Sequence, residues 1–411
     1  MIPDKGLTIT KEDIDKAYLA IHEHLPITPL LASPKLSERC GCEVLLKLEN
    51  RQMTGSFKER GAWNKLLSLT AEERNNGIIA ASAGNHAQGV AYNARQLGIR
   101  AKIVMPTGTP LTKIVATQGY GAEVILHGNS YDDAYELAVE LGTKDSLTLI
   151  HAFDDPLIVA GQGTIAIEIV QDELCADLDM IVCPIGGGGL IGGLATYMKA
   201  VRPEVKIIGV EATQCASMAQ ALQMGQPVKL ARGASLADGI AVKRVGQINY
   251  NLAKSYVDEV IAVDEDEIAR GVLLLLELEK FVAEGSGAVP LAALMTYPQK
   301  FVNKKVLLII SGGNIDVNVL DKIITRGLTV AGRIVELKAR VPDQPGFLAD
   351  VLKVFREQQA NVLDVSHHRY YSSTPFGFVD VSITLETKGH SHIDRIKQAM
   401  STEGYLLNAK E

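Results

Sequence analysis

A run of glycines is the most concentrated chemical signal in the sequence. Six glycines fall between positions 186 and 193, in the segment Ile-Gly-Gly-Gly-Gly-Leu-Ile-Gly-Gly, between an apolar strand pattern and a helical pattern. Glycines there let successive backbone N–H groups converge on an anion, and the helix start adds partial positive charge. We therefore predict a phosphate-binding loop made by Gly186, Gly187, Gly188 and Gly189.

The glycine run alone leaves open which phosphorylated compound binds. Gly187, Gly189 and Gly192 also satisfy the dinucleotide fingerprint, and Glu211 follows about 20 residues later, where an acid can hold a ribose. A nucleotide P-loop is excluded, because no Gly-Lys-Ser/Thr follows the glycines. An NAD enzyme therefore remains an alternative until other motifs are considered.

A lysine at an unfavourable electrostatic position is a candidate nucleophile. Lys58 lies in Thr-Gly-Ser-Phe-Lys-Glu-Arg, where we expect it in the first turn of a helix. The helix N-terminus repels cations, and partial burial beside Phe57 adds to this effect. Both would lower the pKa of the amine and free it to attack a carbonyl. The alternative is an ordinary solvated lysine, which most lysines are.

Two more polar loops follow apolar strand patterns. Ser82-Ala-Gly-Asn-His begins a helix, and Ser82, Asn85 and open backbone amides there would form a cradle for a carboxylate. His86 is a candidate base, although a structural histidine held by its neighbours is the favoured interpretation. Ser311, in Ser-Gly-Gly-Asn, brings a hydroxyl to the sheet edge where α/β folds bind ligands.

These motifs depend on a framework of alternating strands and helices that extends over about 325 residues. Short apolar runs such as 78–81 and 306–310 alternate with helical patterns such as 157–173. This alternation is typical of βαβ units with parallel sheets covered on both faces. There are too many units for one compact sheet. We predict an α/β catalytic region, 1–326, with a large lobe (about 1–50 and 152–326) and a small lobe (about 51–151).

The pattern changes near the C-terminus. After a linker at 327–332, residues 333–411 show the order βαββαβ, which is typical of a small ferredoxin-like module. Basic and acidic residues are equal in number from Arg333 onward, so the net charge of −7 belongs to the preceding residues. This difference supports a separate domain.

Composition excludes several classes of protein. The chain has 47% hydrophobic residues and a net charge of −7 without a basic run, which argues against nucleic-acid and anionic-membrane binding. Its longest apolar runs are far shorter than the ~20 residues of a membrane span. Five scattered cysteines, and a first segment without an apolar signal stretch, favour a reduced, cytoplasmic protein. No Cys/His spacing predicts a metal site.

Taken together, the four motifs resemble the fold type II (tryptophan synthase β-like) family of pyridoxal-phosphate enzymes, in its threonine dehydratase and serine dehydratase/serine racemase branch. The resemblance covers about residues 1–325. It implies pyridoxal 5'-phosphate as cofactor and displaces the NAD interpretation. It further implies that Lys58 forms the Schiff base and that Gly186–Gly189 hold the phosphate. The remaining implied contacts are Phe57, Asn85 and Ser311 with the cofactor ring, and Ser82, Asn85 and His86 with the substrate carboxylate.

The resemblance implies conversion of L-threonine to 2-oxobutanoate and ammonia, and of L-serine to pyruvate, in isoleucine biosynthesis. Lys58 would then act as the base at Cα. Serine racemases place a second serine where this chain has Ala83, so a dehydratase is favoured. Racemase-like members also have an aspartate six residues after the acid equivalent to Glu211, where this chain has Ser217, which argues against a divalent-metal site and leaves a monovalent cation near Glu211 as an alternative. A non-enzymatic amino-acid sensor is the remaining alternative, and the intact lysine argues against it.

The C-terminal module resembles the ACT domain, an amino-acid-sensing module. Pro345, Gly346 and Phe347 form a sharp turn before its first helix, where helix N-terminal amides stay accessible. The resemblance implies a ligand near this turn, with isoleucine as inhibitor, valine as antagonist and a homodimer or homotetramer as the assembly. The alternative is a dimerisation module without a ligand.

Overall fold

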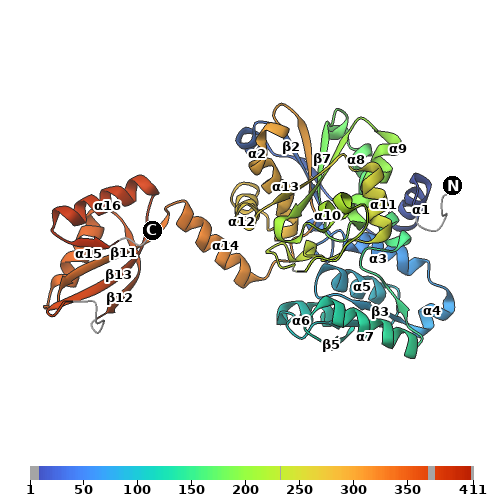
Figure 1. Ribbon diagram of the computed structural model, residues 1–411, viewed down its shortest axis with the longest axis horizontal. Coiled ribbons are helices and arrows are strands. Elements are labelled where there is room, and N and C mark those ends of the chain that lie inside the picture. The colour runs from blue at the N-terminus through green and yellow to red at the C-terminus, as the bar shows by residue number, and fades with distance from the viewer. Residues whose placement is uncertain (1–8, 232, 369–374, 409–411) are drawn as a thin grey trace. The chain divides into compact units, whose positions relative to one another are not determined.

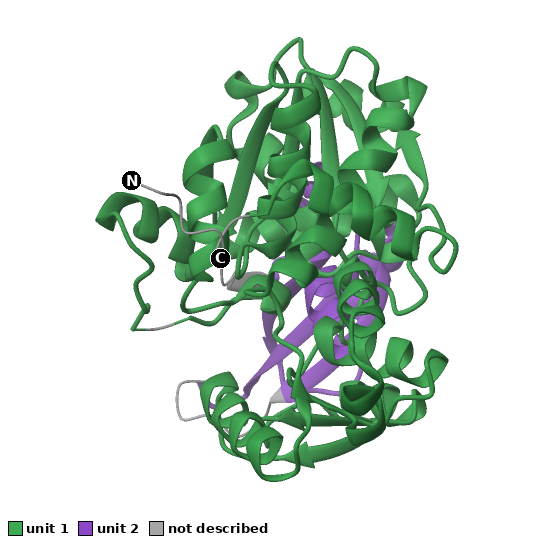
Figure 2. Cartoon of the chain, turned by 90° about the vertical axis from the view of Figure 1, so that its right-hand side faces the viewer, with its two compact units in different colours: residues 1–316 green, residues 317–411 purple. Residues whose placement is uncertain are grey.

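The chain folds into two compact units. The computed structural model describes residues 9–231, 233–368 and 375–408. The two units are Met1–Asp316 and Val317–Glu411, coloured separately in Figure 2. Within the described residues, none of the helices has the length and apolarity needed to cross a lipid bilayer.

The first unit contains a six-stranded sheet in the order β1-β2-β10-β7-β8-β9 (Figure 1). Only β1 is antiparallel to its neighbour, and the other pairs are parallel. The central strand β10 reads Lys-Val-Leu-Leu-Ile-Ile and is buried from Val306 onward, as expected for a parallel strand covered on both faces. The strands are β1 (Leu30–Ala32), β2 (Glu43–Leu48), β7 (Met180–Pro184), β8 (Lys206–Ala212), β9 (Glu259–Val263) and β10 (Lys305–Ile310).

A second, four-stranded parallel sheet lies in the same unit, in the order β5-β4-β3-β6. Separate clusters of buried apolar residues lie on its two faces. Its strands are β3 (Ile78–Ala81), β4 (Ala101–Met105), β5 (Glu123–Leu126) and β6 (Thr148–Leu149). The predicted α/β architecture with two sheets is therefore confirmed, and these two sheets are called the large-lobe and small-lobe sheets below.

Helices separate the strands along the chain, as the βαβ pattern predicts. Those that carry or support the polar loops are α3 (Lys58–Leu67), α5 (Asn85–Gln96), α8 (Pro156–Gln171), α9 (Gly189–Val201), α11 (Gln247–Tyr256) and α13 (Gly285–Thr296). The other helices of the first unit are α1 (Lys11–Ile21), α2 (Pro34–Cys40), α4 (Ala71–Asn76), α6 (Leu111–Gly119), α7 (Tyr131–Lys144), α10 (Ser217–Met224) and α12 (Glu265–Leu274).

A buried cluster of charges anchors helix α3. The guanidinium of Arg60 donates to both carboxylate oxygens of Glu49, at 2.8 Å each, and to Glu168 on α8 at 2.6 Å. Lys47 on β2 completes the cluster with a 2.5 Å ion pair to Glu168. All four side chains are buried. Each charge is therefore paired and hydrogen-bonded, which is the condition for keeping charges in a protein interior.

Glycines allow three helices to pack unusually closely beside this cluster. A Cβ atom on Gly161 of α8 would lie 2.7 Å from the Cα of Gly61 on α3. A Cβ atom on Gly193 of α9 would lie 2.3 Å from the carbonyl oxygen of Val159. Gly193, the last glycine of the run at 186–193, therefore serves helix packing.

The second unit has the predicted βαββαβ order. Its antiparallel sheet has the strand order β12-β13-β11-β14. One face of the sheet packs with its helices around a core that includes Leu337, Phe355 and Ile383. The elements are β11 (Ile334–Pro342), α15 (Phe347–Glu357), β12 (Asn361–His368), β13 (Phe378–Glu386), α16 (His390–Thr402) and β14 (Leu406–Asn408).

The boundary between the units lies earlier than expected. The structure divides the chain after Asp316, whereas the sequence places the end of the first region at 326 and a linker at 327–332. Helix α14 (Val317–Val330) runs through most of that expected linker without interruption. Gly327 lies inside the helix, because a single glycine costs only about 1 kcal/mol there.

Replacing Arg60 with methionine tests the buried cluster. Arg60→Met leaves the carboxylates of Glu49 and Glu168 without their main counter-charge, so we expect the free energy of unfolding to fall by about 3–5 kcal/mol. The fluorescence of Trp63, the single tryptophan, reports denaturation of this unit from α3 itself. The control is Arg270→Met, whose half-exposed pair with Glu267 is worth less than about 1 kcal/mol. Equal losses in both variants would contradict the assigned role of the cluster.

Candidate active site

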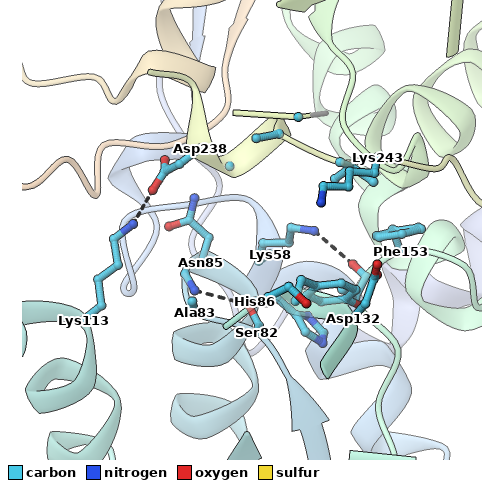
Figure 3. Close-up of a pocket in the computed structure, with 18 of the residues that line it drawn as sticks. Lys58, Ser82, Ala83, Asn85, His86, Lys113, Asp132, Phe153, Asp238 and Lys243 are labelled. Carbon is cyan, nitrogen blue, oxygen red and sulfur yellow. Dashed lines mark hydrogen bonds and ion pairs between the residues drawn. The ribbon is translucent and has the colours of Figure 1, made fainter. Parts of the chain in front are cut away.

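The predicted site residues line one cavity between the two sheets. Its volume is about 420 Å³, and a narrower extension shares Lys58, Asn85 and Glu284 with it. Figure 3 shows Lys58, Ser82, Asn85 and His86 around the main chamber. Loops at the carboxyl ends of β3, β6, β7 and β10 contribute to the lining, as expected for ligand sites in parallel sheets. The predicted residues in the extension are Phe57, Lys58, Asn85, Gly186, Gly187, Gly188, Gly189 and Ser311.

Lys58 begins α3 and is half-buried, with its exposed part facing the cavity. Its Nζ donates a 2.9 Å hydrogen bond to the carbonyl oxygen of Ala152 and lies 5.2 Å from the ring centre of Phe57. Burial lowers the pKa of Lys58 to about 8, against a smaller opposing effect of the Glu284 carboxylate. A substantial fraction of the amine is therefore neutral, and nucleophilic, near neutral pH.

The glycine loop connects β7 to α9 and lines the narrow extension. Gly188 has φ of +92°, and a Cβ on Gly187 would overlap the ring of Phe153 at 2.2 Å. Only glycine fits either position. Because the first amides of a helix have no acceptor within it, the N–H groups at the start of α9 are available to an anion.

Two residues that hold the loop were missed by the sequence analysis. Asn249 on α11 is buried, and its Nδ2 donates to the carbonyl oxygens of Gly187 and Phe153, both at 2.9 Å. These bonds satisfy two carbonyl groups beside the loop, where a free carbonyl oxygen would repel a phosphate. No local pattern marks Asn249 or Phe153, because both act through contacts distant in sequence.

The loop after β3 lines the main chamber and ends at the N-terminus of α5. The Ser82 hydroxyl accepts a 3.3 Å hydrogen bond from the amide of Gly84. His86 is buried, and its Nε2 lies 3.1 Å from the carbonyl oxygen of Ile150, so this nitrogen carries the proton. Burial, with a smaller effect of the Lys58 charge, lowers the pKa of His86 to about 3. His86 is therefore neutral, which agrees with the favoured structural interpretation.

Charged side chains from both lobes meet at the cavity. Lys113 of the small lobe pairs with Asp238 of the large lobe, and both line the chamber. Lys229 pairs across the lobes with Asp132 at 2.6 Å. Lys243 also projects into the chamber, toward Lys58 in Figure 3.

Glu211 lies away from the cavity lining and is buried. Its carboxylate accepts hydrogen bonds from the amides of Met218 and Ala219 at 2.8 and 2.9 Å. Burial raises the pKa of Glu211 to about 7 despite these bonds. Within the part of the chain that the structure describes, no group of three or more His, Cys, Asp or Glu side chains is arranged to hold a metal ion.

The cavity fits a phosphorylated aldehyde. It combines an amine of lowered pKa with a glycine loop whose amides are open, and the aromatic rings of Phe57 and Phe153 lie beside both. A Cβ atom at Gly187 would overlap the ring of Phe153, so the glycine lets this ring lie directly against the loop. Pyridoxal 5'-phosphate has the aldehyde, the ring and the phosphate that this arrangement requires.

The lowered pKa of Lys58 predicts the pH dependence of cofactor capture. Above a pKa of about 8 the amine is neutral, so the rate at which cofactor-free protein captures pyridoxal phosphate rises with pH and levels off above about pH 8. With an ordinary lysine side chain, the rate of capture would level off only above about pH 10.4. Stopped-flow absorbance measures the rate, and Lys58→Arg is the unreactive control. A midpoint near 10.4 would show that the cavity does not perturb the amine.

Comparison with known proteins gives a consistent result. A family model described as pyridoxal-phosphate dependent enzyme matches residues 21–312. The L-threonine ammonia-lyase of Thermotoga maritima is 47% identical over 97% of this chain and 98% of its own length.

Solved structures with the same fold include a processed threonine deaminase isoform 2 from Solanum lycopersicum, with a TM-score of 0.72 and 38% identity over 78% of this chain and 95% of that one. A serine racemase from Dictyostelium discoideum has a TM-score of 0.69 and 36% identity over 75% of this chain and 99% of that one. With the cavity and its lysine, these findings show that the chain belongs to the family of pyridoxal-phosphate-dependent enzymes and that pyridoxal 5'-phosphate is its cofactor.

Proposed function

We propose that this protein is an L-threonine ammonia-lyase that also acts on L-serine. The observation that carries the proposal is the amine of Lys58 in one cavity with the glycine loop, in a chain that matches the L-threonine ammonia-lyase of Thermotoga maritima over nearly its full length. L-threonine gives 2-oxobutanoate and ammonia: one water leaves as the β-hydroxyl and is regained when the C–N bond is hydrolysed. L-serine gives pyruvate in the same way.

Two loops hold the reactants in this proposal. Gly186–Gly189 bind the cofactor phosphate through backbone amides, while Phe57 and Ser311 contact its ring. The N-terminus of α5, with Ser82, Asn85 and His86, binds the substrate carboxylate through open backbone amides and the Ser82 hydroxyl. The single ring N–H of neutral His86 is used by the carbonyl oxygen of Ile150, so His86 contributes through its backbone amide in the first turn of α5.

Proton transfer is assigned to Lys58. When bound, the cofactor supplies the electron sink that allows the Cα–H bond to break. Lys58 takes this proton, because a pKa near 8 gives its amine a far larger neutral fraction at physiological pH than an ordinary lysine has. The methyl side chain of Ala83, which lines the chamber, has no proton to deliver to the opposite face of Cα. Elimination is therefore favoured over racemisation.

We further propose that the second unit is an ACT-type regulatory domain that binds isoleucine as an inhibitor, with valine as antagonist, in a homodimer or homotetramer. Support comes from its element order and from the turn at Pro345, Gly346 and Phe347. Gly346 has φ of +101° and caps α15, so a residue with a side chain would be strained there. The five cysteines are free and buried, which fits the proposed location in the reducing cytoplasm.

Replacing Lys58 tests the catalytic proposal. We expect Lys58→Ala to lower kcat for L-threonine by at least about a thousandfold, because it removes both the covalent anchor and the base. The control is Lys65→Ala on the same helix. Lys65 forms an ion pair with Asp155, and both residues lie outside the cavity lining. Coupled detection of 2-oxobutanoate measures both. Retained turnover in Lys58→Ala, or equal loss in the control, would contradict the assignment.

Isoleucine titration tests the regulatory proposal. We expect isoleucine to reduce threonine turnover and to raise the Tm, since a ligand that binds only the folded state stabilises it. Gly346→Ala strains the turn and should weaken both effects at least about fivefold. The control is Gly389→Ala, which has a similar φ of +112° at the start of α16. The proposal fails if isoleucine changes neither turnover nor Tm in the unmodified protein.

A further inference from the structure

An asparagine beside the cavity, Asn314, has no role in the sequence motifs or in the proposed function. Asn314 follows β10, three residues after Ser311, and is half-buried. It lies outside the cavity lining, but its side chain contacts Asn85, which lines both the chamber and the extension. Its effect on the site must therefore pass through Asn85.

The contacts of Asn314 determine which way its amide faces. Its Nδ2 donates to the carbonyl oxygen of Thr54 at 2.6 Å and to the Oδ1 of Asn85 at 2.8 Å. A backbone carbonyl oxygen can only accept, so the amide nitrogen of Asn314 must face Thr54. Both N–H groups of Asn314 are then used, and Asn85 must offer its oxygen to the second one.

The opposite side of Asn85 requires the same orientation. Its Nδ2 donates to the Oε1 of Glu284 at 2.7 Å, and the hydroxyl of Ser286 contacts the same oxygen at 2.5 Å. The Oε1 of Glu284 is the acceptor in both contacts, so Asn85 must present an N–H group to it. A reversed Asn85 would place two oxygens against each other at Glu284 and two N–H groups against each other at Asn314. Both neighbours therefore favour one of its two orientations.

Two glycines let these side chains approach. A Cβ on Gly55, which has φ of +74°, would lie 2.6 Å from the Oδ1 of Asn314. A Cβ on Gly312 would lie 2.5 Å from the Oε1 of Glu284. The two glycine segments are joined by a hydrogen bond of 2.9 Å from the amide of Gly313 to the carbonyl oxygen of Gly55. The side-chain amides of Asn85 and Asn314 are thus enclosed by backbone and have little space to rotate.

We propose that Asn314 is a positioning residue that keeps the amide of Asn85 oriented with N–H, rather than oxygen, toward the cofactor. An asparagine amide has two N–H groups, and Glu284 uses one, which leaves the other for an acceptor in the cavity. The acceptor we infer is the anionic ring oxygen of the bound cofactor, which an N–H stabilises and an amide oxygen repels. The inference rests on the proposed contact between Asn85 and the cofactor.

The test replaces the hydrogen-bond donors of Asn314 with acceptors and keeps the shape of the side chain. Asn314→Asp removes the N–H groups and supplies only acceptors, so Asn85 is driven toward the reversed orientation. The matched control is Asn50→Asp, another asparagine beside Gly313, whose Nδ2 donates to the carbonyl oxygen of Val282 at 3.0 Å and which lies outside the cavity lining. Both substitutions add the same charge, and only one contacts Asn85.

The readouts use the holoenzyme and separate positioning from stability. In Asn314→Asp we expect the pH midpoint of the cofactor's visible absorbance band to shift upward by at least about one pH unit, a tenfold change in equilibrium. We expect kcat for threonine to fall roughly 10- to 100-fold, the equivalent of one hydrogen bond to a charged group, with KM changed less than about threefold. Asn50→Asp should match the unmodified protein in both, and the Tm of each variant reports folding.

Asn314→Ala keeps the inference testable if the aspartate variant does not fold. It removes the donor without adding a charge, so both orientations of Asn85 become populated and the midpoint should fall between those of the unmodified protein and Asn314→Asp. Absorbance midpoints that stay within about 0.2 pH unit of the control in the folded variants would overturn the positioning role. Failure of the unmodified protein to turn over threonine would overturn the proposed function instead, while the spectral comparison still stands.

Discussion

The site depends on the buried pairing of Arg60 with Glu49 and Glu168. This cluster links helix α3 to Glu49, which directly follows strand β2, and to Glu168 on helix α8, which also pairs with Lys47 on β2. Lys58 lies two residues before Arg60, so the same contacts fix the base of the side chain to which we assign catalysis. The pKa of Lys58 is lowered mainly by burial, and burial is maintained only while α3 stays in place. Electrostatic anchoring in the interior thus sustains the reactivity of an amine at the cavity.

Residues with a local signal could be predicted from the sequence. The glycine loop and the Ser82–His86 segment each join a strand end to a helix start, and Lys58 begins a helix; these arrangements are visible in a few consecutive residues. Asn249 and Lys243 could not be predicted in this way. Asn249 lies in an ordinary helical pattern, and its importance comes from carbonyl groups at Phe153 and Gly187, distant along the chain.

The glycines show the same limit of prediction from sequence, because this residue type serves two different purposes in the structure. The sequence locates Gly188 and Gly193 in one run, but the first has a positive φ and the second has an ordinary helical backbone pressed against α8. Gly327 was expected in a linker and lies within α14. A glycine marks a place where backbone needs freedom or space, and only the neighbouring chain segments determine which. The α/β architecture was predictable because strand and helix periodicities are local, whereas the unit boundary was not.

The division of the cavity lining between two sheets has an evolutionary consequence. The glycine loop and Ser311 follow strands of the large-lobe sheet, whereas the Ser82–His86 segment follows a strand of the small-lobe sheet. With the proposed assignments, the loop that holds the cofactor phosphate and the loop that holds the substrate carboxylate belong to different sheets, and Asn85 is a residue of the small-lobe loop that also contacts the cofactor. Mutations in this loop at positions other than Asn85 can therefore change the choice of amino-acid substrate while the glycine loop still holds the cofactor phosphate.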